Sequence, residues 1–431
     1  MASIGASDRT RNDEDLAAER AVTDNLVAEA LDLLSDDFPD HAIGTRPVHS
    51  VGIGAVGWFR PTDVAAEYCK APHFIRGTET PVRVRFSNGN GQNDPDGRLQ
   101  VRGMAIRFYV GGTLVEVDGG NRHTGTGEAA PDGTDDDAIV ERQAGPMVMT
   151  DLLCASVPVF MSRSLEHFIA FQKAMLPQKV RRPSLLARLK SLITMCPIPP
   201  QEDGVTTSGA IGGFAYANLH RPAQGFAVES SMLRPPQSYA RTMYHAVHAF
   251  AIEDSDGRVR MVRFFLEPVD GVHAEGPGEP VRSLIGATLT QPTVNTYGRT
   301  LPERYLAAEL EERLARGPSR FNLRAQVADA WDDTSDPTTP WPMNRERILL
   351  GTVTLQRLVD EPDSECEQLS FNPGRLIEGI APSDDPVFAA RVAIYEESYR
   401  RRMMARALPV PADECPVRRV TPHTQTVSSV I

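Results

Sequence analysis

Two stretches of the sequence carry side chains whose types and spacing suit redox and acid–base chemistry. His49 lies in RPVHSVG, and a histidine can both accept and donate a proton near neutral pH. Far along the chain, RVAIYEESYRRR places Arg391, Tyr395, Ser398 and Arg402 at i, i+4, i+7 and i+11. On a helix these four share one face, which is polar and aromatic where a plain core helix would be aliphatic. An arginine one turn before a tyrosine can hold positive charge against a phenolate oxygen.

A helix is expected to position the C-terminal group. The stretch SDDPVFAARVAIYEESYRRRMMARAL offers Ser383 as a candidate N-cap, acidic residues in the first turn and arginines in the last turn. Capping and the helix dipole both favour a helix here.

Alternating patterns predict the strands that support His49. In TPVRVRFS, Val82, Val84 and Phe86 alternate with polar residues, and GMAIRFYV from Gly103 to Val110 alternates in the same way, so each strand should be half-buried. A β-hairpin is expected around residues 254–257. Two further helices are predicted, one acidic helix with Val22, Leu26, Ala30 and Leu33 on a face and one closed by Gly317. The chain therefore mixes α and β without a repeating βαβ pattern.

Composition limits the classes of function. The 431 residues carry a net charge of −12, which argues against a surface for nucleic acid, because phosphate contacts need clustered Lys and Arg. Five widely spaced cysteines without a CxxC pair indicate reduced thiols rather than a disulfide framework or a zinc site. The N-terminus lacks the apolar region of a signal peptide, and no stretch is long and apolar enough for a transmembrane helix. A cytoplasmic protein is expected.

The chain is expected to hold one large domain with flanking segments. Residues 1–38 form a polar N-terminal segment with a helix, residues 39–408 form the domain, and residues 409–431 form a C-terminal tail. Within the domain, residues 118–147 are rich in Gly and Asp with few large apolar residues, which predicts a flexible surface insertion.

Three separated motifs, taken in order, resemble segments of haem catalases. RPVHSVG (Arg46 to Gly52) resembles the distal histidine segment, VRFS (Val84 to Ser87) the serine-bearing strand, and RVAIYEESYRRR (Arg391 to Arg402) the proximal tyrosine helix. Other segments, among them YCKA at residues 68–71 and FNPGRLIEGIAPSDDP at 371–386, extend the similarity over most of residues 40–405, thinning from about 175 to 320. The resemblance implies an α+β fold, with an antiparallel β-barrel core, helical additions and a C-terminal proximal haem helix.

The resemblance also implies a cofactor and roles for particular residues. The cofactor would be haem b, with Tyr395 as the ligand of the ferric iron and Arg391 beside it. His49 would move a proton between the two peroxide oxygens, and Ser87 would orient its imidazole. The remaining haem-binding residues that the resemblance implies are Arg46, Arg85 and Arg402 at the propionates, with Val48, Phe160 and Phe168 at the walls. Taken alone, each of these residues also has an ordinary structural interpretation, and His245 and His248, which lack metal-ligand spacing, are interpreted as structural.

One segment departs from the family pattern. Where catalases carry a distal asparagine, this chain has DLLCASVPVFMSR, so the position falls on Ala155 or Ser156, and Ser156 is the candidate polar group. Met161 also replaces an aromatic residue. Loss of one pre-organised donor typically costs about 10²–10³ in rate, which argues against rapid dismutation of H₂O₂ while leaving histidine-assisted O–O cleavage feasible.

The favoured hypothesis is a haem-dependent oxidoreductase, peroxidase-like and at most weakly catalatic, which cleaves the O–O bond of H₂O₂ or an organic hydroperoxide. Its partners would be the peroxide and a small organic donor, and the resemblance allows a homo-oligomer. Two alternatives remain open. One is a haem-dependent hydroperoxide lyase, isomerase or biosynthetic tailoring enzyme, and the other is a haem-binding or sensing protein with low turnover.

Overall fold

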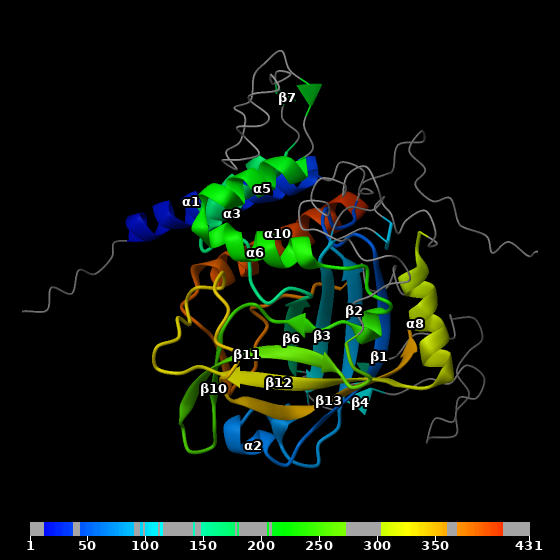
Figure 1. Ribbon diagram of the computed structural model, residues 1–431. Coiled ribbons are helices and arrows are strands. Elements are labelled where there is room, and N and C mark those ends of the chain that lie inside the picture. The colour runs from blue at the N-terminus through cyan, green and yellow to red at the C-terminus, as the bar shows by residue number, and fades with distance from the viewer. Residues whose placement is uncertain are drawn as a thin grey trace, which may run out of the picture.

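The strands of the computed structural model form one large antiparallel sheet and two short pairs (Figure 1). The large sheet contains β1 (Gly52–Pro61), β2 (Thr80–Asn88), β3 (Arg102–Val110), β6 (Val148–Ala155), β9 (Tyr244–His245), β10 (Phe250–Glu253), β11 (Val259–Pro268), β12 (Ser319–Val327), β13 (Arg347–Leu358) and β14 (Ile380–Pro382). The short pairs are β4 (Thr113–Leu114) with β5 (Glu141–Arg142) and β7 (Lys179–Val180) with β8 (Val205–Thr206). The structure describes residues 13–37, 44–89, 95–97, 100–110, 113–114, 141–142, 148–176, 179–180, 205–206, 209–272, 303–359 and 369–407.

The large sheet closes into a barrel. Its strand order is β12-β13-β1-β2-β3-β6-β9-β11, and the ring closes because β11 also pairs with β12 along Val262 to Pro268. Strands β10 and β14 continue the sheet beyond β11. The predicted α+β fold with an antiparallel barrel core is confirmed.

The helices lie on the outside of the barrel. They are α1 (Asp13–Asp37), α2 (Ala65–Tyr68), α3 (Leu165–Met175), α5 (Gly209–Leu219), α6 (Arg221–Met232), α8 (Tyr305–Arg316) and α10 (Pro386–Ala407), with 3₁₀ turns at Pro72–Phe74 and Tyr239–Arg241. Figure 1 shows α1, α3, α5, α6 and α10 gathered above one end of the barrel, with α8 along its side. Helix α1 contacts both α3 and α10, so the helical layer holds α10 against the barrel.

Both faces of the central strands are buried, which corrects the prediction of half-buried strands. On β2, Val84 and Phe86 point into the barrel core, and on the opposite face Arg85 and Ser87 are also buried. The alternation reports which residues enter the barrel. It does not report that polar side chains on the outer face are covered by other parts of the chain.

The N-cap of helix α10 lies two residues after its predicted position. The Asp385 carboxylate accepts a hydrogen bond from the backbone N–H of Val387 at 2.8 Å, and Asp385 directly precedes Pro386, the first residue of the helix. Asp385 is therefore the N-cap, and the prediction of Ser383 is wrong. The acidic residues also precede the helix rather than occupying its first turn. A proline suits the first helical position because its missing N–H has no partner there in any helix.

Several other predicted elements are confirmed. The hairpin at residues 254–257 joins β10 to β11, and Gly257 has a φ of 80° that glycine adopts without strain. Helix α8 ends at Gly317, whose N–H donates to the carbonyl of Arg313 at 3.2 Å. Cys69 and Cys154 are buried free thiols. Most of the predicted insertion and the C-terminal tail lie outside the described residues, and in the described part no helix is long and apolar enough to cross a membrane.

The barrel core contains an aromatic cluster that should dominate local stability. Phe59 is fully buried, and its ring centroid lies 5.8 Å from that of Phe74 and 5.4 Å from that of Phe108, both edge to face. We expect Phe59→Ala to lower the free energy of unfolding by about 3–5 kcal/mol through lost burial and a residual cavity. Urea denaturation checks this. Trp331→Ala is the control, because Trp331 is 92% exposed and its loss should change stability by less than about 0.5 kcal/mol.

Candidate active site

Tyr395 and Arg391 contact each other on α10, as the predicted helix face requires. An Arg391 Nη2–H donates to the Tyr395 phenol oxygen at 3.3 Å, and the guanidinium carbon lies 5.5 Å from the centroid of the tyrosine ring. The spacing of four residues brings the two side chains together on one side of the helix. A cation therefore touches the oxygen that would have to act as a phenolate ligand.

Arg391 is held in turn by two residues whose role the sequence did not reveal. His248 Nε2 accepts from Arg391 Nη1 at 2.7 Å, and His248 Nδ1 donates to the Asp385 carboxylate at 2.5 Å. Burial lowers the pKa of His248 to about 4, with the nearby Arg391 acting in the same direction and the hydrogen bond to Asp385 opposing it. A neutral imidazole with its proton on Nδ1 satisfies both contacts. His248, interpreted from sequence as structural only, thus aims Arg391 at Tyr395.

His49 lies on the segment that leads into β1 and contacts the predicted serine. Its Nδ1 is 3.0 Å from Ser87 Oγ, which leaves Nε2 for another partner. Space for the ring depends on Gly103, where a Cβ would lie 2.7 Å from Ser87 Oγ and 3.0 Å from the imidazole. His49 also has a φ of 56°, a conformation that a residue with a Cβ adopts at a cost of about 1–3 kcal/mol. The fold therefore accepts backbone strain to place this imidazole.

The imidazole of His49 is neutral across the physiological range. Desolvation of the imidazole by the surrounding protein is the largest cause that lowers its pKa to about 3, and the positive charges of Arg85, Arg391 and Arg46 lower it further. Because these charges act on His49, the distal segment, β2 and α10 lie within electrostatic reach of one another. A neutral histidine is ready to accept a proton rather than release one.

The three predicted propionate arginines lie on the distal segment, β2 and α10. Arg85 is buried beneath the distal segment, because a Cβ on Gly52 would lie 2.4 Å from its guanidinium carbon. Arg402 is buried on α10, with its guanidinium 5.4 Å from the ring centroid of Tyr399. Arg46 donates to the backbone carbonyl of Leu369 at 2.8 Å.

The predicted apolar wall residues lie beside α3 and α10. Val48 and Phe168 pack against a cluster of α1, α3 and α10 that includes Ala390 and Ile394. Phe160 stacks on Phe168 with ring centroids 6.2 Å apart, and its ring also lies 5.5 Å from the guanidinium carbon of Arg391. Phe160 therefore lies beside Arg391 on the proximal side.

In the segment that lacks the amide, Ala155 and Ser156 have different neighbours. Ala155 pairs in register with Gly103, which pairs with Ser87 on its other side, so Ala155 shares the row of the serine that contacts His49. The Ser156 hydroxyl instead accepts from the backbone N–H of Arg102 at 2.9 Å. Ala155 therefore offers a methyl group in that row, and the Ser156 hydroxyl is engaged by the backbone of the neighbouring strand.

The donor set fits a haem. It combines a phenol oxygen in contact with a guanidinium, a neutral imidazole, guanidinium groups of the kind that bind carboxylates in pairs, and stacked aromatic rings. These groups come from the distal segment, β2, α10, and α3 with the turn that precedes it.

The strain at His49 is testable on the haem-free protein. We expect His49→Gly to have a free energy of unfolding about 1 kcal/mol above that of His49→Ala, because alanine retains the left-handed backbone conformation at full cost and glycine does not. Chemical denaturation measures both variants. At the neighbouring Ser50, whose φ is not positive, alanine should instead be the more stable of the pair. An alanine variant at position 49 as stable as the glycine variant would contradict the strain.

Comparison with known proteins places this arrangement in a family. The family model for catalase matches residues 17–114 and 319–428. A catalase-related peroxidase of Mycolicibacterium paratuberculosis is 30% identical over 364 residues, which are 83% of this chain and 89% of that protein. A second catalase-related peroxidase, from Synechococcus elongatus, is 25% identical over 361 residues and 84% of each chain.

Solved structures agree on the fold. The structure of a bacterial catalase aligns with a TM-score of 0.58 and 19% sequence identity, covering 95% of this chain and 65% of that one. A fungal catalase aligns with a TM-score of 0.56 and 19% identity, covering 91% of this chain and 63% of that one. With the relative that is 30% identical over most of both chains, this confirms the predicted resemblance. The chain is an oxidoreductase that belongs to the catalase family, in the branch of catalase-related peroxidases.

Proposed function

We propose that this oxidoreductase binds ferric haem b through Tyr395 and uses it to cleave the O–O bond of H₂O₂ or of an organic hydroperoxide, with a small organic molecule as the electron donor. The observation that carries the proposal is the contact of Arg391 with the Tyr395 phenol oxygen, within electrostatic reach of a neutral His49. When bound, the haem would supply a redox-active iron and the two electrons that cleavage of the O–O bond consumes. Arg46, Arg85 and Arg402 would pair with its propionates, with Val48, Phe160 and Phe168 against its apolar faces.

His49 would move the proton that heterolytic cleavage requires. In the tautomer whose Nδ1–H donates to Ser87 Oγ, the Nε2 lone pair accepts a proton from one peroxide oxygen and returns it to the other, which departs as water or alcohol. Its neutral state means that no prior deprotonation is needed. Ser87 fixes the ring orientation, and the strained backbone brings the ring over Gly103.

The residue at position 155 favours peroxidase over catalase turnover. Dismutation needs a second H₂O₂ to bind in an orientation set by hydrogen bonds, and the methyl group of Ala155 provides none in the row of Ser87 and Gly103. An alkyl group on the peroxide or on a donor suits this apolar surface better than water-like H₂O₂ does. We therefore assign no proton-transfer step to Ser156 and expect an organic hydroperoxide or donor at this surface.

Tyr395→Phe tests the cofactor assignment. We expect reconstituted wild-type protein to show the high-spin absorption spectrum of a phenolate-ligated ferric haem, and the variant to lose that spectrum because phenylalanine offers no oxygen. Tyr399→Phe is the matched control on the same helix, where the ring contacts Arg402 and no contact with Arg391 is found in the described chain. An unchanged spectrum in Tyr395→Phe would rule the ligand out.

The pH dependence tests the neutral histidine. The pKa of His49 is lowered to about 3, so the base is available at higher pH and is lost only as the pH falls toward that value. We expect the rate of the first reaction with peroxide to be level between about pH 5 and 8. A histidine with the ordinary pKa of 6.5 would lose about 30-fold in rate by about pH 5. Stopped-flow mixing with H₂O₂ and with an organic hydroperoxide measures this. His49→Ala should bind haem yet react slowly with both peroxides at every pH.

A further inference from the structure

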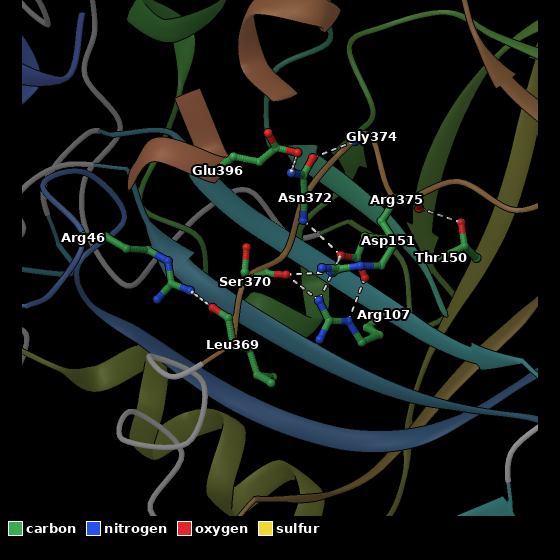
Figure 2. Close-up of polar contacts among 10 residues, drawn as sticks. All are labelled: Arg46, Arg107, Thr150, Asp151, Leu369, Ser370, Asn372, Gly374, Arg375 and Glu396. Carbon is green, nitrogen blue, oxygen red and sulfur yellow. Dashed lines mark hydrogen bonds and ion pairs between the residues drawn. The ribbon is translucent and has the colours of Figure 1, made fainter. Parts of the chain in front are cut away.

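A buried carboxylate on the barrel, that of Asp151, holds a segment of the chain that precedes α10. Asp151 on β6 is 3% exposed, and its carboxylate accepts from Arg107 Nε at 2.8 Å and Nη2 at 3.0 Å. The same carboxylate also bonds the guanidinium of Arg375 and accepts from the backbone N–H of Asn372 at 2.9 Å (Figure 2). Two cations and one backbone amide thus converge on one anion, which satisfies its charge away from water.

These bonds fix a segment that we call the strap, residues 369–376, against the barrel. Arg107 and Arg375 both donate to the backbone carbonyl of Ser370, the second at 2.7 Å. The backbone of the strap also pairs with β6, because Asp151 N–H donates to the carbonyl of Arg375 at 2.9 Å and Thr150 Oγ1 donates to the same oxygen at 3.1 Å. The strap therefore cannot slide without breaking a buried ion pair.

The strap contacts one face of α10. A Cβ on Gly374 would lie 2.8 and 2.9 Å from the two methyl carbons of Val392, so the backbone of the strap lies directly on this side chain. One turn later, Asn372 Nδ2 donates to Glu396 Oε1 at 3.4 Å, and Asn372 Oδ1 accepts from the Gly374 N–H at 2.8 Å, which orients the amide. Figure 2 shows Asn372 between Asp151 and Glu396.

The contacted face bears a fixed angular relation to the face that carries the ligand. Val392 directly follows Arg391 in the sequence, and Glu396 directly follows Tyr395. Successive residues on a helix are about 100° apart around its axis. Contacts that hold Val392 and Glu396 therefore also set the direction of Tyr395 around the helix axis. A phenol oxygen about 8 Å from the helix axis moves about 1.4 Å when the helix turns by about 10°, and a displacement of that size at a reacting centre can cost about 100-fold in rate.

The same strap also contacts the distal side. Its first residue, Leu369, accepts from Arg46 Nη2 at 2.8 Å, and Arg46 is one of the charges that lower the pKa of His49. Figure 2 places Arg46 at one end of the strap and Glu396 near the other. One segment thus contacts a group on each side of the site.

We infer that Asp151, acting through the strap, is a positioning residue that sets the rotation of α10 and with it the direction of the Tyr395 phenol oxygen. The expected effect on haem binding rests on the proposed role of Tyr395 as the iron ligand. The expected effect on the position of the Tyr395 side chain applies to the haem-free protein as well. Asp151 itself touches no reacting atom.

Variants at the contact between the strap and the helix test this without breaking the buried ion pair. Gly374→Ala pushes a methyl group against Val392, and Glu396→Ala removes the acceptor of Asn372, whereas Glu396→Gln keeps a carbonyl oxygen for it. Glu397→Ala is the control, because this carboxylate contacts Arg400 and Arg401 and no contact with the strap is found among the described residues. Thermal unfolding of each variant identifies any that fails to fold.

The first readout needs no haem. In protein labelled with 3-fluorotyrosine, the ¹⁹F resonance of Tyr395 is assigned as the signal that disappears from the spectrum of Tyr395→Phe. We expect it to shift in Gly374→Ala and Glu396→Ala and to stay in place in Glu396→Gln and Glu397→Ala. An unmoved resonance in folded Gly374→Ala and Glu396→Ala overturns the inference, whether or not the protein binds haem.

The second readout uses the reconstituted protein. Hemin titration should show an affinity about tenfold lower in Gly374→Ala and Glu396→Ala, with weakened tyrosinate bands in the resonance Raman spectrum, and Glu396→Gln should restore both. Wild-type affinity and bands in these two variants would overturn the inference. If wild-type protein shows no tyrosinate bands, the proposed ligand fails, and the ¹⁹F result still decides whether the strap positions Tyr395.

Discussion

The geometry of the site depends on the guanidinium of Arg391, which bonds His248 with one nitrogen and Tyr395 with another. A cation keeps a defined direction only if its partners are themselves fixed, and Asp385 fixes His248. Asp385 is also the N-cap of α10. The residue that caps the helix thus also orients, through His248, the cation on that helix.

Positive charge serves opposite purposes on the two sides of the site. Near Tyr395 it compensates an oxygen that would carry a full negative charge, and near His49 it helps burial to keep an imidazole uncharged. Both needs are met by the same kind of group because an acid and a cationic base respond to a cation in the same direction, toward loss of a proton. Gathering several guanidiniums in one place raises their mutual repulsion, which a ligand with two carboxylates would reduce.

Local sequence patterns predicted the helices and strands, but they did not predict contacts between residues that are distant in the sequence. The alternation of β2, the hairpin before β11, the glycine after α8 and the polar face of α10 all depend on neighbours within a few residues. The residue pairs that position the site do not depend on near neighbours. His248 and Arg391 are 143 positions apart, and Asp151 and Arg375 are 224 positions apart. Ser383 was a plausible cap from composition, and only the bond from Val387 to Asp385 identifies the actual one. Burial of Arg85 likewise requires knowing which segment covers the barrel.

The closed ring of strands also has a consequence for biosynthesis. Strand β1 pairs with β13, whose last residue, Leu358, is about 300 positions farther along the chain, so the edge of β1 has no barrel partner until the ribosome has made most of the protein. Domains generally begin to fold as they emerge, and unpaired strand edges favour aggregation in the interval. The helix that carries Tyr395 follows later still. If Tyr395 binds the iron as proposed, the haem site is complete only near the end of translation.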